Sequence, residues 1–310
     1  MRVVVTGGAG FVGSHLCDAY IARGDQVVCV DNLSSGNLAN VYPLRGNPGF
    51  SFLEADVRHE PVVEGDVDAV LHFASPASPK YYLAHPLLTM ETGSLGTKWC
   101  VELARRHGAR FLVASTSEVY GDPVVHPQVE SYWGNVNPIG ERSVYDEAKR
   151  YAEAMTAMYR RHFDVNTAII RIFNTYGPRM HADDGRVVST FIRQAIAGEP
   201  LTVFGAGDQT RSFCHVTDLV AGIIAMVDSD AAGPINLGNP NEFSILQLAE
   251  EVLRQTDAAS VLEHRPLPSD DPTRRRPDIS RATKLLGWSP SIQLAEGVAD
   301  TIAWFRTTCP

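Results

Sequence analysis

The chain has 310 residues, of which 44% are hydrophobic and 20% are charged, and its formal net charge is −9. This composition is typical of a globular protein and excludes a disordered or fibrous chain. The acidic balance argues against broad binding to nucleic acid or to an anionic membrane, because both need a net basic face. No apolar run approaches the roughly 18–20 residues that a membrane span requires.

The first half of the chain alternates strand patterns with helix patterns. Strands are expected at residues 2–6, 26–31, 51–55, 69–74, 110–115 and 166–173, and helices at residues 11–23, 87–107 and 143–162. Short, almost continuously apolar strands that alternate with helices are typical of a parallel sheet covered on both faces. The order therefore predicts an α/β fold built on a Rossmann-type, doubly wound parallel sheet.

After about residue 175 the pattern changes, and loops become longer and richer in proline and charge, as at residues 268–277. Helices are expected at residues 187–198, 216–228, 244–256 and 294–306, with short strands at 201–204 and 235–237. The length suits two domains at roughly 150 residues each. We expect a Rossmann domain at residues 1–175 and a smaller C-terminal α/β substrate domain at residues 176–310, with some chain crossing back to the sheet.

The N-terminal residues run directly into the first strand pattern, so we expect no leader segment and a cytoplasmic protein. The five cysteines are scattered and odd in number. None forms a C-x-x-C pair, and no histidine stands at zinc-finger spacing. A disulfide framework and a bound metal are therefore not expected.

A glycine-rich loop follows the first expected strand and opens the first expected helix. Gly7, Gly10 and Gly13 have the spacing G-x-x-G-x-x-G, which permits a tight turn and lets backbone N–H groups approach a pyrophosphate. Asp31 ends the next strand, where an acid binds both ribose hydroxyls of NAD. An arginine there would favour the 2′-phosphate of NADP, so Asp31 and Asn32 predict NAD as the cofactor of the first domain.

Tyr145 and Lys149 stand four residues apart on an expected helix, so their side chains share one face. Tyrosine has an ordinary pKa near 10 and is a poor base at pH 7. A neighbouring ammonium and a positive nicotinamide ring would lower that pKa, so that Tyr145 takes a proton from a sugar hydroxyl while a hydride leaves the same carbon. Thr116 and Ser117 end an earlier strand, at the edge of the sheet where ligands bind.

Strand-end hydroxyls, a downstream tyrosine and lysine, and a glycine-rich NAD loop together resemble the extended short-chain dehydrogenase/reductase family. Longer strings, which run through nearly the whole chain to Pro290, resemble the UDP-glucuronate decarboxylases (UDP-xylose synthases) within that family. These strings are residues 73–79, 115–123, 125–128, 132–140, 173–180 and 184–189.

One position separates this chain from a related group of enzymes. The dTDP-glucose 4,6-dehydratases carry an Asp-Glu pair after the strand-end threonine, and the aspartate protonates the leaving hydroxyl. Here Ser117 precedes Glu118. A dehydratase without that acid would lose general-acid assistance of roughly 10²–10⁴-fold. Decarboxylation expels CO₂ and needs no such acid, and serine leaves room for a substrate carboxylate.

The resemblance implies NAD-dependent decarboxylation of UDP-glucuronate to UDP-xylose through a 4-keto intermediate, with NAD regenerated in each cycle. The catalytic residues it implies are Tyr145, Lys149, Thr116, Glu118 and Arg275. The residues expected to bind NAD are Gly7, Gly10, Phe11, Val12, Gly13, Asp31, Asn32, Asp56, Val57, Ala74, Tyr145 and Lys149. The residues expected to bind the nucleotide sugar are Tyr82, Ser117, Asn174, Arg186, Arg211 and Arg275.

Two positions depart from the family's pattern. Ala148 stands where the family has glycine before the catalytic lysine, and Gly93 stands where related chains have asparagine. The resemblance also implies a homodimer that pairs through the helices at 87–107 and 143–162. No nucleic-acid or membrane partner is expected.

Other functions remain open from the sequence. A sugar-nucleotide 4-epimerase, a dTDP-glucose 4,6-dehydratase-like enzyme and a catalytically silent NAD sensor share this fold, because a fold does not fix a function. The sensor is disfavoured because Tyr145 and Lys149 are both present. The nucleotide base, UDP against dTDP or GDP, is not determined by these motifs.

Overall fold

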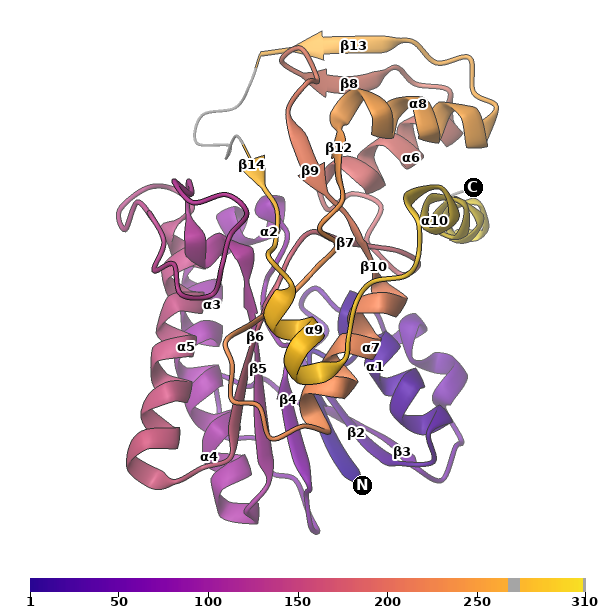
Figure 1. Cartoon of the computed structure of the whole chain (residues 1–310). Coiled ribbons are helices and arrows are strands. Elements are labelled where there is room, and N and C mark those ends of the chain that lie inside the picture. The colour runs from indigo at the N-terminus through magenta and orange to yellow at the C-terminus, as the bar shows by residue number, and fades with distance from the viewer. Residues whose placement is uncertain (267–273, 309–310) are drawn as a thin grey trace.

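The structure is a computed structural model that describes residues 1–266 and 274–308 (Figure 1). Residues 268–273 of the long charged loop expected at 268–277 lie outside the described residues. The side chain of Arg274 is also outside them. A central sheet with its helices forms the lower part of the molecule in Figure 1, and smaller sheets with further helices form the upper part.

The central sheet has seven strands in the order β11-β6-β5-β4-β1-β2-β3, and every neighbouring pair is parallel. This arrangement confirms the predicted α/β fold with a doubly wound parallel sheet. The order reverses direction beside β1, which is where such sheets bind ligands. The strands are β1 (Arg2–Thr6), β2 (Gln26–Asp31), β3 (Phe50–Glu54), β4 (Ala69–His72), β5 (Arg110–Thr116), β6 (Thr167–Ile172) and β11 (Ile235–Leu237).

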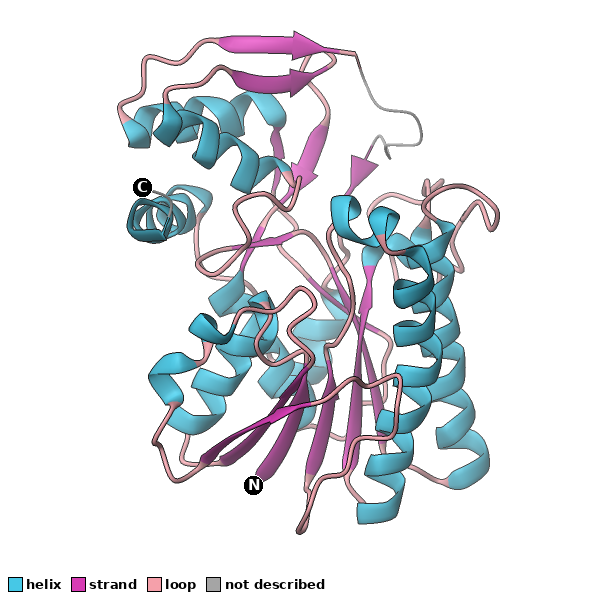
Figure 2. Cartoon of the chain, turned by 180° about the vertical axis from the view of Figure 1, so that it is seen from behind, coloured by secondary structure: helices cyan, strands magenta, loops and turns pink. Residues whose placement is uncertain are grey.

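Both faces of this sheet are buried, because successive side chains of a strand point to opposite faces. Val3 and Val5 of β1 belong to one hydrophobic core and Val4 to another. Figure 2 shows helices on both sides of the sheet. The first core is covered by α1 (Phe11–Ala22), α7 (Val216–Val227) and α9 (Ser280–Leu286), and the second by α4 (Thr97–His107) and α5 (Ser143–Phe163).

The prediction of one continuous α-helix at residues 87–107 is wrong, because a π-helical turn interrupts the helix. The segment forms α3 (Pro86–Glu91), a π-helical turn (Thr92–Gly96) and α4. In the π turn the hydroxyls of Thr92 and Ser94 donate to the carbonyl oxygens of Leu88 and Met90, at 2.7 Å each. Such a turn inserts one extra residue into a helix and is frequent at functional sites. The apolar periodicity on both sides of the turn conceals it from sequence patterns.

The upper part of the molecule has its own hydrophobic core, which α6 (Val187–Ala197), α8 (Ile245–Thr256) and α10 (Leu294–Thr308) enclose. The strand expected at residues 201–204 is confirmed, whereas strand patterns did not reveal the other strands of its small sheets, because each has only two to four residues. The paired strands are β8 (Leu201–Phe204) with β13 (Leu262–Arg265), β7 (Thr175–Tyr176) with β10 (Cys214–His215), and β9 (Thr210–Ser212) with β12 (Glu242–Ser244) and β14 (Arg274–Arg275). A short helix that was also not expected, α2 (Pro79–Ala84), follows β4.

The chain passes between the two parts more than once. Strand β11 pairs with β6, and α7 packs on the central sheet, although both come after residue 175. The division of domains at residues 1–175 and 176–310 stays a proposal. Within the two described stretches of chain, no helix is both long and apolar enough to cross a membrane.

Candidate active site

A cavity of about 1710 Å³ lies between the carboxyl ends of the central strands and the upper part of the molecule. Pockets that hold a single small-molecule ligand have volumes of roughly 300–1,000 Å³, so this cavity has room for a dinucleotide and a second ligand. Each residue that the sequence predicts to react, to bind NAD or to bind the nucleotide sugar lines it. Their roles stay proposals, but the fold brings all of them to one cavity.

The glycine-rich loop leaves no space for side chains. Gly7 has a φ of 68°, and a Cβ there would lie 2.7 Å from the backbone nitrogen of Ala74. A Cβ on Gly13 would lie 2.1 Å from the carbonyl oxygen of Gly7. Gly10 immediately precedes α1, so the N-terminus of that helix opens into the cavity. The bare backbone and the helix dipole fit a dinucleotide pyrophosphate.

Asp31 lies at the end of β2 and is 7% exposed. Its two carboxylate oxygens accept hydrogen bonds from the backbone nitrogens of Ala9 and Leu33, at 3.0 and 2.8 Å. Burial raises the pKa of Asp31, although these two hydrogen bonds oppose the rise. A Cβ on Gly36 would lie 2.8 Å from the Asp31 oxygens, so the loop closes tightly over the carboxylate. This crowded, acidic surface suits ribose hydroxyls and disfavours a 2′-phosphate.

Asp56 follows β3 and is engaged by neighbouring side chains. Asn32 donates to it at 3.0 Å, and Arg58 forms an ion pair with it at 2.9 Å. Burial opposes the charge, but the hydrogen bonds from Arg58 hold the pKa of Asp56 at about 2. Arg58, which the sequence motifs did not reveal, also pairs with Glu91 at 2.8 Å. Asp56 is therefore an ionised carboxylate at the side of the cavity where the adenosine of NAD is expected.

Tyr145 and Lys149 project from α5 toward the end of β5. Lys149 Nζ donates to the carbonyl oxygen of Ala114 at 2.9 Å and lies 5.7 Å from the centre of the Tyr145 ring. Burial lowers the pKa of Lys149 to about 8. At neutral pH the ammonium is therefore still mostly protonated and places a positive charge beside the phenol.

The lowering of the Tyr145 pKa that is expected with the nicotinamide ring bound stays a prediction, and the protein groups by themselves act in the opposite direction. Burial raises this pKa, and the negative charge of Glu118 raises it further, whereas a hydrogen bond with Thr116 acts in the opposite direction. The Tyr145 ring stacks on Tyr82 of α2, with centroids 4.9 Å apart and planes at 6°. Deprotonation of Tyr145 therefore depends on additional positive charge in the cavity.

Glu118 lies in a short 3₁₀ turn after β5 and receives two arginines. Arg275 of β14 donates to both carboxylate oxygens, and its bond to Oε2 is 2.9 Å long. Arg142, the residue before α5, donates to the same Oε2 at 2.7 Å. Burial opposes ionisation, but the two guanidinium groups hold the pKa of Glu118 below its ordinary value. Glu118 is therefore a carboxylate at neutral pH.

Arg142 is the main site residue that the sequence patterns missed. It stands three residues before Tyr145 and lines the cavity, but its partner Glu118 comes from a different element. An arginine before a helix is not by itself a functional signal. Only the approach of the 3₁₀ turn to the start of α5 shows its role.

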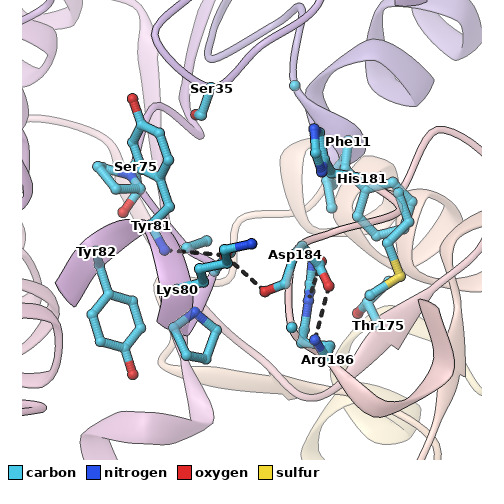
Figure 3. A pocket seen from close by; sticks show the side chains of 18 of the residues that line it. Phe11, Ser35, Ser75, Lys80, Tyr81, Tyr82, Thr175, His181, Asp184 and Arg186 are labelled. Atoms are coloured by element: carbon cyan, nitrogen blue, oxygen red, sulfur yellow. Dashed lines mark hydrogen bonds and ion pairs between the residues drawn. The ribbon is translucent and has the colours of Figure 1, made fainter. Parts of the chain in front are cut away.

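The remaining predicted arginines come from the upper part of the molecule. Arg186 pairs with Asp184, as drawn in Figure 3, and its guanidinium lies 5.9 Å from the centre of the Phe11 ring. Arg211 of β9 is the register partner of Arg275 in the parallel pair with β14. Both guanidinium side chains therefore start from the same edge of the cavity. Asn174, in the loop after β6, also lines the cavity.

Helix α2 contacts both walls of the cavity. Ser78, its N-cap, donates to the carbonyl oxygen of Asp184 at 2.8 Å, and Lys80 forms an ion pair with Asp183. Tyr81 donates to the carbonyl oxygen of Ser34 at 2.5 Å. Figure 3 shows Tyr81 and Tyr82 on one side of the space and Asp184 with Arg186 across from them.

Comparison with protein families matches residues 3–238 to the NAD dependent epimerase/dehydratase family. The chain is 53% identical over 306 residues to UDP-glucuronic acid decarboxylase 1 of Arabidopsis thaliana, which covers 99% of this chain and 70% of that protein. It is 50% identical over 305 residues to UDP-glucuronic acid decarboxylase 1 of Xenopus tropicalis, which covers 98% of this chain and 72% of that protein.

Solved structures of the same fold are more distant in sequence. UDP-glucose 4-epimerase of Thermotoga maritima, solved with UDP-glucose, superposes with a TM-score of 0.90 at 28% identity and covers 100% of both chains. UDP-glucuronic acid 4-epimerase of Bacillus cereus, solved with UDP-glucuronic acid and NAD, has a TM-score of 0.88 at 26% identity. It covers 99% of this chain and 100% of that one.

Proposed function

The chain belongs to the NAD dependent epimerase/dehydratase family, and from this membership we propose that it converts UDP-glucuronate to UDP-xylose and CO₂. Its relatives at 50 to 53% identity are UDP-glucuronic acid decarboxylases, whereas the epimerases are similar at 26 to 28%. The observation that carries the choice is Ser117 beside a Glu118 that two arginines hold. A dehydratase would need an acid at position 117.

NAD is the cofactor, and the residues of the cavity fit it. The glycine-rich loop would hold the pyrophosphate, Asp31 the adenosine ribose, and Asp56 and Val57 the adenine side. When bound, NAD accepts a hydride from C4 of the sugar and returns it after CO₂ has left. The positive charge that comes with the oxidised cofactor opposes the effect of burial on Tyr145.

Tyr145 would start the reaction by accepting the proton of the C4 hydroxyl at its Oη. Tyr145 acts as a base in its phenolate form, which the ammonium of Lys149 stabilises, and it becomes the neutral phenol when it takes this proton. Thr116, which is hydrogen-bonded to Tyr145, would hold the tyrosine and the sugar oxygen in line. The 4-ketone that forms is β to the C6 carboxylate. The electron pair of the C5–C6 bond therefore passes to the C4 oxygen as CO₂ leaves. The hydroxyls of Tyr145 and Thr116 stabilise that enolate by hydrogen bonds.

Glu118 would act after CO₂ has left. Its lowered pKa means that it carries no proton of its own to give at neutral pH. It would instead orient a water molecule that protonates C5. Arg275 would bind the substrate carboxylate, because a guanidinium binds a carboxylate through two parallel hydrogen bonds. Tyr82, Ser117, Asn174, Arg186 and Arg211 would hold the sugar and the diphosphate.

The active unit that we propose is a homodimer. The outer surfaces of α3, the π turn and α5 expose large apolar side chains, including Leu87 at 69% and Met90 at 46%. Leu95, Tyr151 and Phe163 add to this surface. A second copy that packs the same helices against these residues would bury them. The cytoplasmic location expected from the sequence stays a prediction.

The test is incubation of the purified protein with UDP-glucuronate and NAD⁺ in D₂O, followed by proton NMR of the product. UDP-xylose with one deuterium at C5 is expected, because C5 is protonated from solvent after CO₂ has left. The variant Tyr145→Phe should lower kcat by roughly 10²–10⁴-fold and still bind NAD. UDP-galacturonate as the product, or unchanged substrate, would contradict the proposal.

A further inference from the structure

Glu118 has two arginine partners of different origin. Arg275 comes from β14 in the upper part of the molecule (Figure 1), whereas Arg142 precedes α5, the helix that carries Tyr145. The backbone carbonyl of Arg142 accepts hydrogen bonds from the nitrogens of Tyr145 and Asp146, at 3.0 and 3.1 Å. Arg142 is thus fixed to the first turn of the catalytic helix. The Glu118–Arg142 pair lies within one part of the molecule, and the Glu118–Arg275 pair joins the two parts.

The two arginines cannot have the same role when substrate is bound. Arg275 is 6% exposed, and it directs its guanidinium at both oxygens of Glu118. If Arg275 turns this fork to the substrate carboxylate, Glu118 loses one of its two cations. A buried carboxylate without a partner is costly and tends to take up a proton. In the described part of the chain, Arg142 is the positively charged residue that would then still contact Glu118.

We propose that Arg142 is the positioning residue of this site, which keeps Glu118 in place and ionised while Arg275 exchanges that carboxylate for the carboxylate of the substrate. This inference deepens the proposed decarboxylase function and rests on it. Arg142 acts through Glu118 and does not itself contact the reacting atoms. The site needs two arginines because one carboxylate belongs to the protein and the other to the substrate.

The charges around Glu118 agree with this assignment. Burial opposes the positive charge of Arg142, but Glu118 raises the pKa of Arg142 above its ordinary value. Substitution of Arg142 by a neutral residue therefore removes a permanent positive charge that lies beside the buried carboxylate of Glu118. The pKa of Glu118 should then rise. The titratable and charged groups that face Glu118 are Arg275 of β14, Arg142, Tyr145 and Asp146 at the start of α5, and Tyr82 of α2.

The test compares Arg142→Met with Arg142→Lys and with the control Arg160→Met. Arg160 lies on the same helix but contacts the carbonyl oxygen of Thr167, away from the site. We expect Arg142→Met to lower kcat by roughly 10- to 100-fold, the range that loss of a charged hydrogen bond gives, with little change in KM. The acidic limb of its kcat profile should move to higher pH. Arg142→Lys should recover part of both effects, and Arg160→Met should resemble the wild type.

A second readout is independent of turnover. The pKa of Glu118 is measured by ¹³C NMR of carboxyl-labelled glutamate in the cofactor-loaded protein, with Glu118→Gln to assign the signal. Arg142→Met should raise that pKa, and circular dichroism verifies that the variant is folded. An unchanged pKa and pH profile would overturn the inference. So would a raised KM with unchanged kcat, because Arg142 would then bind the substrate itself. If the wild type makes no UDP-xylose but the pKa shifts as expected, the failure lies in the proposed function.

Discussion

Two buried carboxyl groups, Glu118 and Asp146, lie near the start of α5 and differ in the partners that surround them. Glu118 has two guanidinium partners, whereas Asp146, which is 6% exposed, has an oxygen (Oδ1) without a hydrogen-bond partner in the described part of the chain. Burial and the charge of Glu118 raise the pKa of Asp146 to about 7, although Arg142 and Arg275 oppose the rise. Asp146 is therefore a carboxyl group that holds its proton close to neutral pH.

This raised pKa predicts a pH-dependent cost in stability. The Asp146 carboxyl titrates near pH 3.9 in the unfolded chain. Between about pH 4 and 7 the folded protein holds a proton that the unfolded chain has released. The free energy of unfolding therefore falls as pH rises, by up to about 1.4 kcal/mol per pH unit from this group. Asp146→Asn should remove this pH-dependent fall in the free energy of unfolding. Urea unfolding should therefore show that the variant becomes more stable relative to the wild type at pH 8 than it is at pH 5.

The control for this prediction is Asp164→Asn at the other end of α5. Asp164 is exposed and has a φ of 53°, a left-handed backbone conformation that asparagine also tolerates. Its stability should follow the wild type at both pH values. If Asp146→Asn also changes in parallel with the wild type, the buried proton is not on Asp146.

At the scale of elements, the contact between the π turn and α5 explains both departures from the family's pattern. A Cβ on Gly93 would lie 2.7 Å from the Cβ of Ala148 and 3.1 Å from its carbonyl oxygen. The two residues therefore occupy one space between them. The family has asparagine at position 93 and glycine at position 148, whereas this chain has Gly93 and Ala148. The larger of the two side chains therefore comes from the π turn in the family and from α5 in this chain.

This exchange predicts that the two positions are coupled. Gly93→Asn alone should destabilise the protein by about 1–3 kcal/mol, because it overpacks the contact with Ala148. Adding Ala148→Gly should recover most of that loss, since it removes the nearest clashing atom. Urea unfolding of the wild type, both single variants and the double variant measures the coupling free energy. Strictly additive effects would show that the two departures are unrelated.

At the scale of the whole molecule, the cavity exists because several contacts hold the two parts together. Arg179 pairs with Asp18 of α1 at 2.6 Å, and His15 lies 2.9 Å from the carbonyl oxygen of Pro178. Ser78 and Arg275 make further contacts across the cavity. These links place the cofactor loop, the catalytic helix and the substrate arginines around a shared space.

The apolar surface of α3, the π turn and α5 predicts the assembly state. Met90→Glu places a charge in the proposed dimer interface and should raise the dissociation constant by roughly 30-fold or more, as loss of an interface hot spot does. Sedimentation of the wild type should give a dimer, and the variant should shift toward monomer. Val62→Glu is the control, because Val62 is 78% exposed outside this surface. A monomeric wild type would contradict the proposed dimer.

Local patterns in the sequence were sufficient for the fold class and for the cofactor-loop and strand-end residues that line the cavity. The glycines before α1, Asp31 at the end of β2 and Thr116 at the end of β5 are placed by strand and helix periodicity alone. Parallel strands bring their carboxyl ends to one edge, so residues at strand ends meet whatever their separation in the chain. Tyr145 and Lys149 share a helix face for an equally local reason.

Only the tertiary structure decided the features that join distant segments. These features are the pairing of Glu118 with Arg142 and Arg275, the pKa of Tyr145, the contact between Gly93 and Ala148, and the pairing of the short strands in the small sheets. Each depends on elements far apart in the chain. The periodicity of one segment carries no information about the side chain that another segment brings against it. Burial and charge act through space, so the electrostatics of the site follow from the packing of the folded chain.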